Sequence, residues 1–300
     1  MVLLLADRYS VSILCQALFS VYSNYQQVNP NDPALVEGFY NMTLQYSRFY
    51  QLYAAIKLLA KEESYTKGSL REALVARKDL DANLPDSKEG AKDVIAELKN
   101  ALLIHMEGEY IQLTTEEDIP DHSGLLFSGK SVSESIHAAD DTEAYERILT
   151  NLTYAHPELL DIAKEVYRNK PLKKFEIKRA LAGKDPFGNK LNDFTIDMGV
   201  ELLTDADVIR KGDRGYTDGN CPISLLAHIV YEEYETLASD EEDGVSEQEL
   251  FGRIELMYGI KKSTFENYLS RLRRHGFVIS GSYGEITLDK NAFNAARIHE

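Results

Sequence analysis

The segment Gly124-Leu-Leu-Phe-Ser-Gly-Lys-Ser131 fits the pattern of a phosphate-cradling loop, in which backbone N–H groups, a lysine and a hydroxyl hold a nucleotide and Mg²⁺. Such a loop needs a buried strand before it and a helix after it. The preceding residues 115–123 are acidic and polar, and the residues after 131 form only a short polar helix candidate. We therefore expect no nucleotide site, and we expect the apolar residues 125–127 to pin this segment against a neighbouring core.

Other side chains capable of chemistry are dispersed. The seven histidines are scattered, and we expect no metal site, no cofactor and no catalytic residue among them. The two cysteines, Cys15 and Cys221, are far apart, so they supply neither a disulfide framework nor a thiolate metal cluster. This usage of cysteine is typical of a reducing, cytoplasmic compartment. An enzyme is therefore not expected.

Positive charge gathers near the end of the chain. In the helix expected after residue 262, Phe265, Tyr268, Leu269 and Leu272 share one apolar face, and small polar and basic residues lie on the opposite face. Such a surface suits a helix that reaches base edges in the major groove. The favourable interaction of cations with a helix C-terminus is an alternative explanation for its arginines. The candidate DNA contacts here are Lys261, Lys262, Ser263, Asn267, Ser270, Arg271 and Arg274.

A second basic stretch covers residues 168–190, where eight basic and two acidic residues give a net charge of +6. Together with a charged hairpin tip at 210–214, it could form a patch that follows a phosphate backbone. The solvated face of an ordinary helix is the alternative interpretation. The candidate contacts in this region are Lys173, Lys174, Lys178, Arg179, Arg210, Lys211 and Arg214.

The whole chain has the opposite charge. Its 300 residues include 49 acidic and 33 basic side chains, for a formal net charge of −16. An acidic surface repels phosphate, so nucleic acid can bind only at a local basic patch. The start of the chain lacks the basic region of a signal peptide, and no apolar stretch approaches the roughly 18 residues of a membrane span. We expect no membrane association.

Three segments of the chain follow the same pattern. In each, a helix ends, a short apolar strand follows, the chain turns at Gly108, Gly212 or Gly281, and a second strand returns. Two helical stretches precede each of these hairpins: about 48–61 and 69–77, 157–168 and 173–181, and 223–237 and 246–257. Ser246 and Ser263 each fit a capping box that starts a helix.

Three helices followed by a two-stranded hairpin resemble the winged-helix superfamily, with Tyr110–Thr114 and Gly284–Leu288 similar to its wings. The fold class we expect is mainly α with small β-hairpins, with three winged-helix units in tandem after an N-terminal helical segment. The expected domains are an N-terminal helical segment at 1–47, winged helix 1 at 48–116, an acidic linker with partial helix at 117–156, winged helix 2 at 157–219, and winged helix 3 with the C-terminal tail at 220–300.

By analogy with this superfamily, we expect a non-enzymatic DNA-binding protein, either a regulator or the DNA-handling subunit of a larger complex. Its partner would be double-stranded DNA, bound by the third winged helix and by the basic patch of the second. The alternative is an acidic scaffold that binds partner protein subunits, resembling the kite-type subunits of chromosome-organising ATPase complexes. A homo-oligomer is compatible with both readings.

Overall fold

The computed structural model describes residues 48–61, 65–77, 82–119, 125–181, 191, 193–238, 244–281 and 284–289. The helical segment expected at 1–47 lies outside this part of the chain. The described residues are mainly helical, with small antiparallel sheets, as the sequence predicts. Among the described helices, none is long and apolar enough to cross a lipid bilayer.

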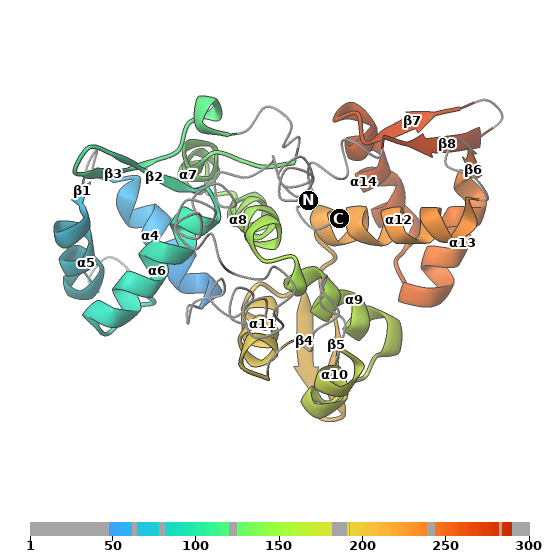
Figure 1. The fold of residues 1–300 in the computed structure, drawn as a ribbon, viewed down its shortest axis with the longest axis horizontal. Helices are drawn as coiled ribbons and strands as arrows, with labels where there is room; N and C mark the ends of the chain where they lie inside the picture. The colour runs from blue at the N-terminus through green and yellow to red at the C-terminus, as the bar shows by residue number, and fades with distance from the viewer. Residues whose placement is uncertain are drawn as a thin grey trace, which may run out of the picture.

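The first unit contains three helices and a small sheet (Figure 1). Strand β3 is central, and β1 and β2 pair with it in antiparallel register, with Met106 opposite Ile111. Gly108 turns the β2–β3 hairpin with a φ of +63°, which a residue with a side chain rarely adopts. The elements are α4 (Phe49–Leu59), β1 (Tyr65–Thr66), α5 (Lys67–Ala76), α6 (Lys88–Asn100), β2 (Ile104–Glu107) and β3 (Tyr110–Leu113).

The stretch 117–156, expected to be an acidic linker with partial helix, is helical over most of its described length. It contains the short 3₁₀ helix η1 (Glu116–Asp118), α7 (Gly129–His137) and α8 (Asp141–Ala155). Helix α8 lies in the middle of the molecule and contacts helices of all three units: α4 and α6, α9, and α12 (Figure 1). Its residues Ala144, Ile148, Leu149 and Leu152 are buried. This helix therefore packs the units together.

The second unit has the same order of elements with a shorter sheet. Strands β4 and β5 pair from Ile209–Asp218 to Gly212–Gly215, and a single antiparallel bridge joins Leu172 to Tyr216 where the first unit has β1. The elements are α9 (Glu158–Asn169), α10 (Lys174–Ala180), α11 (Asp193–Asp205), β4 (Ile209–Gly212) and β5 (Gly215–Asp218).

The third unit repeats the arrangement of the first. Its sheet has the order β6-β8-β7, which matches the order β1-β3-β2 of the first unit. The elements are α12 (Ile223–Leu237), β6 (Val245–Ser246), α13 (Glu247–Tyr258), α14 (Lys262–Arg274), β7 (Val278–Ser280) and β8 (Glu285–Leu288). Each unit thus runs helix, short extended segment, helix, helix and hairpin.

Local sequence signals explain most of the helix boundaries in the third unit. Ser246 caps α13 by accepting a hydrogen bond from the backbone N–H of Glu249 at 3.4 Å. The cap predicted at Ser263 is wrong, because α14 begins two residues earlier than that cap requires and Lys261 occupies the N-cap position without a side-chain cap. Ser263 lies in the first turn instead, which leaves its hydroxyl on the exposed surface.

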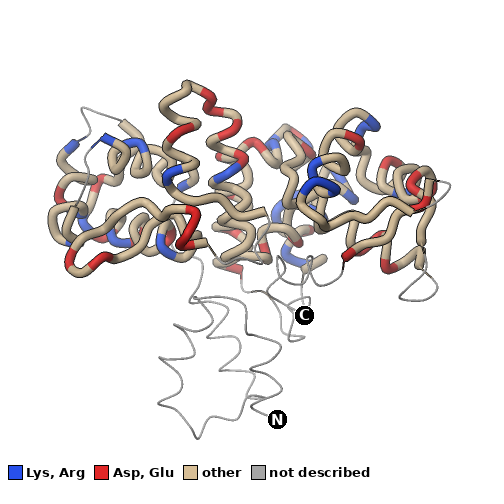
Figure 2. Tube along the Cα trace, turned by 90° about the horizontal axis from the view of Figure 1, so that it is seen from above, with Lys and Arg blue, Asp and Glu red and all other residues tan. Residues whose placement is uncertain are grey.

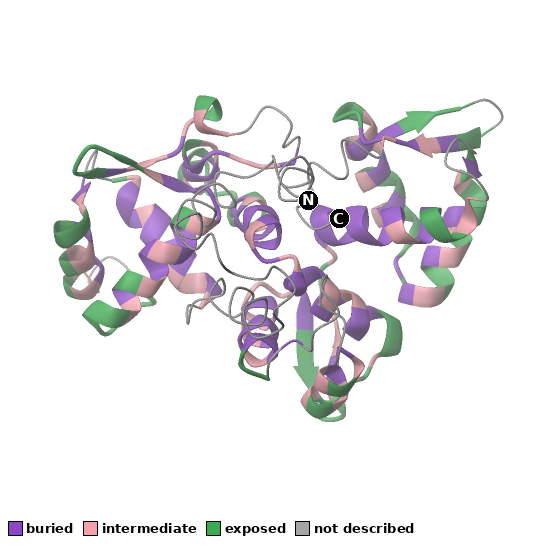
Figure 3. Cartoon of the chain, viewed as in Figure 1, coloured by how far each residue is buried: buried purple, intermediate pink, exposed green. Residues whose placement is uncertain are grey.

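Buried apolar side chains run through all three units and across their contacts (Figure 3). A paired set of charges adds to the junction of the first and second units. Arg48, just before α4, donates to both carboxylate oxygens of Asp205 at the end of α11, at 2.7 and 2.6 Å. This hydrogen-bonded pair raises the pKa of the arginine, although burial opposes the shift. The units are therefore held at fixed positions rather than strung on flexible linkers.

Candidate nucleic-acid interface

Helix α14 presents a polar, basic surface. Phe265, Leu269 and Leu272 are buried as the sequence predicts, and Tyr268 is half-buried, so this stripe holds the helix against α12 and α13. The opposite stripe faces solvent because a 3.6-residue period places it on the other side of the helix. The exposed residues on or beside that stripe are Lys261, Lys262, Ser263, Glu266, Asn267 and Arg274, and Ser270 is half-buried.

Most of the positive charge on this stripe is not neutralised. Lys262 lies 3.6 Å from Glu266, and both side chains are more than half exposed, so this pair is weak. Within the described part of the chain, no carboxylate lies within salt-bridge distance of Lys261 or Arg274. Lys261, Ser263, Asn267 and Arg274 therefore present donors to solvent along one side of α14.

Arg271, which the sequence groups with these residues, is oriented differently. Its Nη1 donates to Oε1 of Glu146 in α8 at 2.7 Å, and its guanidinium lies 5.4 Å from the ring centre of Tyr268. Arg273 likewise pairs with Glu247 of α13. The arginines of α14 thus divide into Arg274, which is exposed, and two that hold the helix to its neighbours.

The basic stretch of the second unit is partly neutralised inside the protein. Lys174 and Lys178 of α10 lie 3.3 and 2.9 Å from Oδ1 of Asp197 in α11, and Lys178 also lies 3.6 Å from Asp193. The hydrogen bond that Lys178 donates to Asp197 raises the pKa of Lys178. Lys173 and Arg179 remain exposed. Residues 182–190 of this stretch lie outside the described residues.

The hairpin of the second unit shows the same division. Arg210 donates twice to Asp207, with both distances at 2.6 Å, whereas Lys211 and Arg214 are exposed at the tip. This hairpin and α10 lie at the bottom of the view in Figure 1, and α14 lies at its upper right. Basic and acidic residues are mixed over the whole described trace in Figure 2. The two predicted patches are therefore separate surfaces and do not form one continuous basic face.

The phosphate-loop pattern at 124–131 has no free cradle in the residues that the structure describes. The N–H of Gly129 donates to Oγ1 of Thr114 at 2.7 Å, and the N–H of Lys130 donates to the carbonyl of Thr114 at 2.9 Å. The N–H of Ser131 donates to Oγ of Ser128, which caps α7. Because the three N–H groups are already paired, they cannot hold a phosphate. Leu125 is buried, as expected, and Lys130 is exposed.

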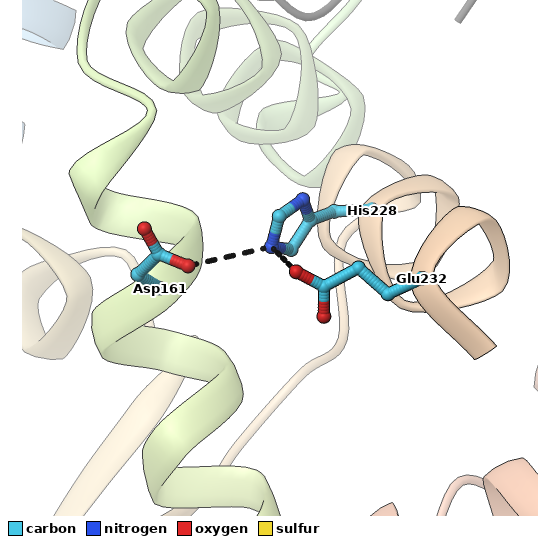
Figure 4. Close-up of side chains that lie close together, drawn as sticks. All are labelled: Asp161, His228 and Glu232. Atoms are coloured by element: carbon cyan, nitrogen blue, oxygen red, sulfur yellow. Dashed lines mark ion pairs between the residues drawn. The ribbon is translucent and has the colours of Figure 1, made fainter. Parts of the chain in front are cut away.

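A cluster resembling a metal site lies between α9 and α12, and it was not predicted from the sequence. His228 and Glu232 are four residues apart on α12, and Asp161 of α9 faces them (Figure 4). The Nε2 atom of His228 lies 3.6 Å from Asp161 and 3.4 Å from Glu232. The i, i+4 spacing of His228 and Glu232 was the signal in the sequence.

Lys164 of α9 already supplies a cation to this cluster. Its Nζ lies 2.7 and 2.8 Å from the oxygens of Glu232, 3.2 Å from Asp161 and 3.3 Å from Nε2 of His228. Burial raises the pKa of Asp161, but its contacts with His228 and Lys164 outweigh burial and lower it overall. The cluster therefore joins the second and third units as an ion-pair network centred on a lysine.

A second ionic group is fully buried at the junction of the first two units. His156 lies between Glu97 of α6, at 2.7 Å from Nε2, and Glu158 of α9, at 3.6 Å from Nδ1. Burial lowers the pKa of His156, but the two carboxylates outweigh it and raise the pKa to about 10. The imidazole is therefore protonated at neutral pH. Burial also raises the pKa of the Cys221 thiol to about 12, which disfavours the thiolate at neutral pH.

Comparison with known proteins gives no relative from which a function could be taken. The chain matches no protein family, no curated protein and no solved structure.

Proposed function

We propose that this chain consists of three tandem winged-helix units and binds double-stranded DNA through the third. The observation that carries the proposal is the outward stripe of α14, where Lys261, Ser263, Asn267 and Arg274 are exposed and Glu266 is the one acidic residue. In a winged helix, the third helix of the unit is the element that enters the major groove. Asparagine and arginine side chains suit contacts with adenine and guanine edges, and lysines suit phosphates.

The acidic remainder of the molecule orients this contact. The formal net charge of −16 repels a duplex from most of the surface, so the unpaired cations of α14 provide a favoured approach. The second-unit patch contributes less to this proposal than the sequence suggests. Lys174, Lys178 and Arg210 are held in internal ion pairs, and α10 and the β4–β5 hairpin lie apart from α14 (Figure 1). The proposed interface is therefore confined to the third unit.

The test is duplex binding by fluorescence anisotropy over a range of salt concentrations. Lys261→Ala combined with Arg274→Ala should weaken binding at least tenfold, and loss of the phosphate contact of Lys261 should reduce the salt slope by about one, since each lost phosphate contact changes it by about 0.9. Neither side chain contacts a carboxylate within the described residues, so folding should be unaffected. The matched control is Lys173→Ala with Arg179→Ala, which removes the same charge from the second unit. Equal effects of the two pairs would reject α14 as the reader.

A scaffold for protein partners is the second candidate, and the surfaces of the first two units favour it. The β2–β3 hairpin exposes Met106 and Tyr110 by 43% and 49% beside Glu107 and Glu109. The third helix of the second unit, α11, exposes Phe194 by 51% next to Asp193. Acidic surfaces with exposed aromatic side chains repel phosphate but suit a protein partner with basic residues.

The two candidates make different predictions for the same variants. A scaffold would capture a partner protein without DNA, and Phe194→Ala or Tyr110→Ala would reduce this capture. The double substitution of Lys261 and Arg274 would leave it unchanged. For DNA binding, the double substitution should weaken duplex affinity, whereas Phe194→Ala and Tyr110→Ala should leave it unchanged. The two affinities can therefore be assigned to different units of the chain.

A further inference from the structure

We propose that Glu146 of α8 competes with DNA for Arg271 and thereby limits the affinity of α14 for a duplex. This inference rests on the proposed function. Arg271 is the residue of the α14 surface that pairs with a carboxylate of α8, outside the third unit, with Nη1 2.7 Å from Oε1 of Glu146. A carboxylate and a phosphate offer the same pair of acceptor oxygens to a guanidinium. Glu146 therefore occupies the position that a phosphate would take.

The contact is strong enough to matter and exposed enough to be exchanged. The side chain of Arg271 is 29% exposed and that of Glu146 is 20% exposed, so water screens the pair only in part. Tyr268 covers one face of the guanidinium at 5.4 Å. Burial, with the negative charge of Glu146 adding to it, raises the pKa of Tyr268 to about 12. The pair is thus partly shielded from water but still reaches the surface.

Its position explains why competition is the expected outcome. Arg271 follows Asn267 by one helical turn and precedes Arg274 by three residues, so it belongs to the same side of α14 as these two residues. An arginine side chain can rotate from α8 toward solvent without moving the helix. To contact DNA, Arg271 must give up Glu146, and the cost of that exchange is subtracted from the affinity. Removing the carboxylate charge removes this cost.

The test uses the full chain and a defined duplex. Glu146→Gln keeps an oxygen that accepts from Arg271 but loses the charge, so the fold is retained. We expect duplex affinity to rise about three- to tenfold, because Arg271 no longer has to give up a charged partner before it contacts a phosphate. Glu143→Gln is the matched control, since it removes the same charge one turn earlier on α8, where the carboxylate pairs with Arg147.

The Arg271→Ala background and the Glu143→Gln control separate this inference from the proposed function. In Arg271→Ala, the gain from Glu146→Gln should disappear, because the competing partner is absent. An equal gain from Glu143→Gln, or a gain that survives Arg271→Ala, would show general charge repulsion and overturn the inference while DNA binding stands. No duplex binding by the wild type or by Glu146→Gln would overturn both.

Discussion

The buried group around His156 allows a sharp test of how the first two units are joined. The side chains of His156 and Glu97 are 0% and 1% exposed, and that of Glu158 is 2% exposed. His156→Ala removes the cation and leaves two carboxylates in an apolar surrounding. A buried charge that loses its partner is among the most destabilising changes known in proteins.

The magnitude follows from the pKa of the histidine. The difference between the ordinary value of 6.5 and about 10 corresponds to at most about 5 kcal/mol, at about 1.36 kcal/mol per pH unit. Breaking a buried ion pair by removing one partner costs about 3–5 kcal/mol, which agrees with this bound. We therefore expect His156→Ala to lower the free energy of unfolding by about 3–5 kcal/mol at pH 7.

The effect of pH has a defined sign. Because the pKa of His156 is raised on folding, its contribution is fully present below pH 6.5 and is lost as the pH rises toward about 10. The stability of the wild type should fall over this window, and His156→Ala should show a smaller slope because the titrating imidazole is gone.

Urea unfolding followed by circular dichroism is the suitable assay, since the chain has no tryptophan. The control is His105→Ala. The side chain of His105 is 29% exposed and lies 3.3 Å from Asp118, so this substitution should lower the free energy of unfolding by less than about 1 kcal/mol. If the free energy of unfolding of His156→Ala lies within about 1 kcal/mol of the wild-type value at pH 7, this result would refute the buried ion pairing of His156 with Glu97 and Glu158.

Three further substitutions test local packing and pairing by the same urea assay. Lys164→Met should lower the free energy of unfolding by about 1–3 kcal/mol. Added Zn²⁺ should raise the melting temperature of this variant more than that of the wild type, because the lysine no longer occupies the cluster of Asp161, His228 and Glu232. Equal Zn²⁺ responses would contradict this. Gly129→Ala should cost about 2 kcal/mol or more, because its Cβ would lie 2.0 Å from the carbonyl oxygen of Leu103. Gly68 has open space around it, so Gly68→Ala should instead raise the free energy of unfolding by about 0.5–1 kcal/mol. Similar effects of the two glycine changes would show that residue 129 does not lie this close to the carbonyl of Leu103.

The order of elements could be predicted from the sequence because it depends on local signals. The predicted helix at 223–237 agrees with α12, and that at 157–168 agrees with α9 within a residue at each end. Glycine at 108 fixed the first hairpin turn through its positive φ. Residues 141–155 were harder, since their acidic start resembles a solvated loop. Their apolar positions are buried against α7 and against helices of all three units.

The candidate site could be predicted only in part, because charge pairing depends on tertiary contacts. The sequence places Arg271 on a polar helix face but does not show that Glu146, 125 residues away, reaches it. The same holds for Lys178, which faces Asp197 of the next helix. Short-range spacing identifies basic residues, whereas folding decides which of them remain free for a ligand.

Photo-cross-linking from α14 tests the central claim most directly. A benzoylphenylalanine placed at Asn267, on the exposed stripe of α14, should cross-link to a bound duplex on irradiation. The same amino acid placed at Glu255, exposed on the neighbouring helix α13, should give little or no cross-link. The account predicts a strong preference for the first position. Equal cross-linking from both positions, or none from Asn267 under conditions where the duplex is bound, would contradict it.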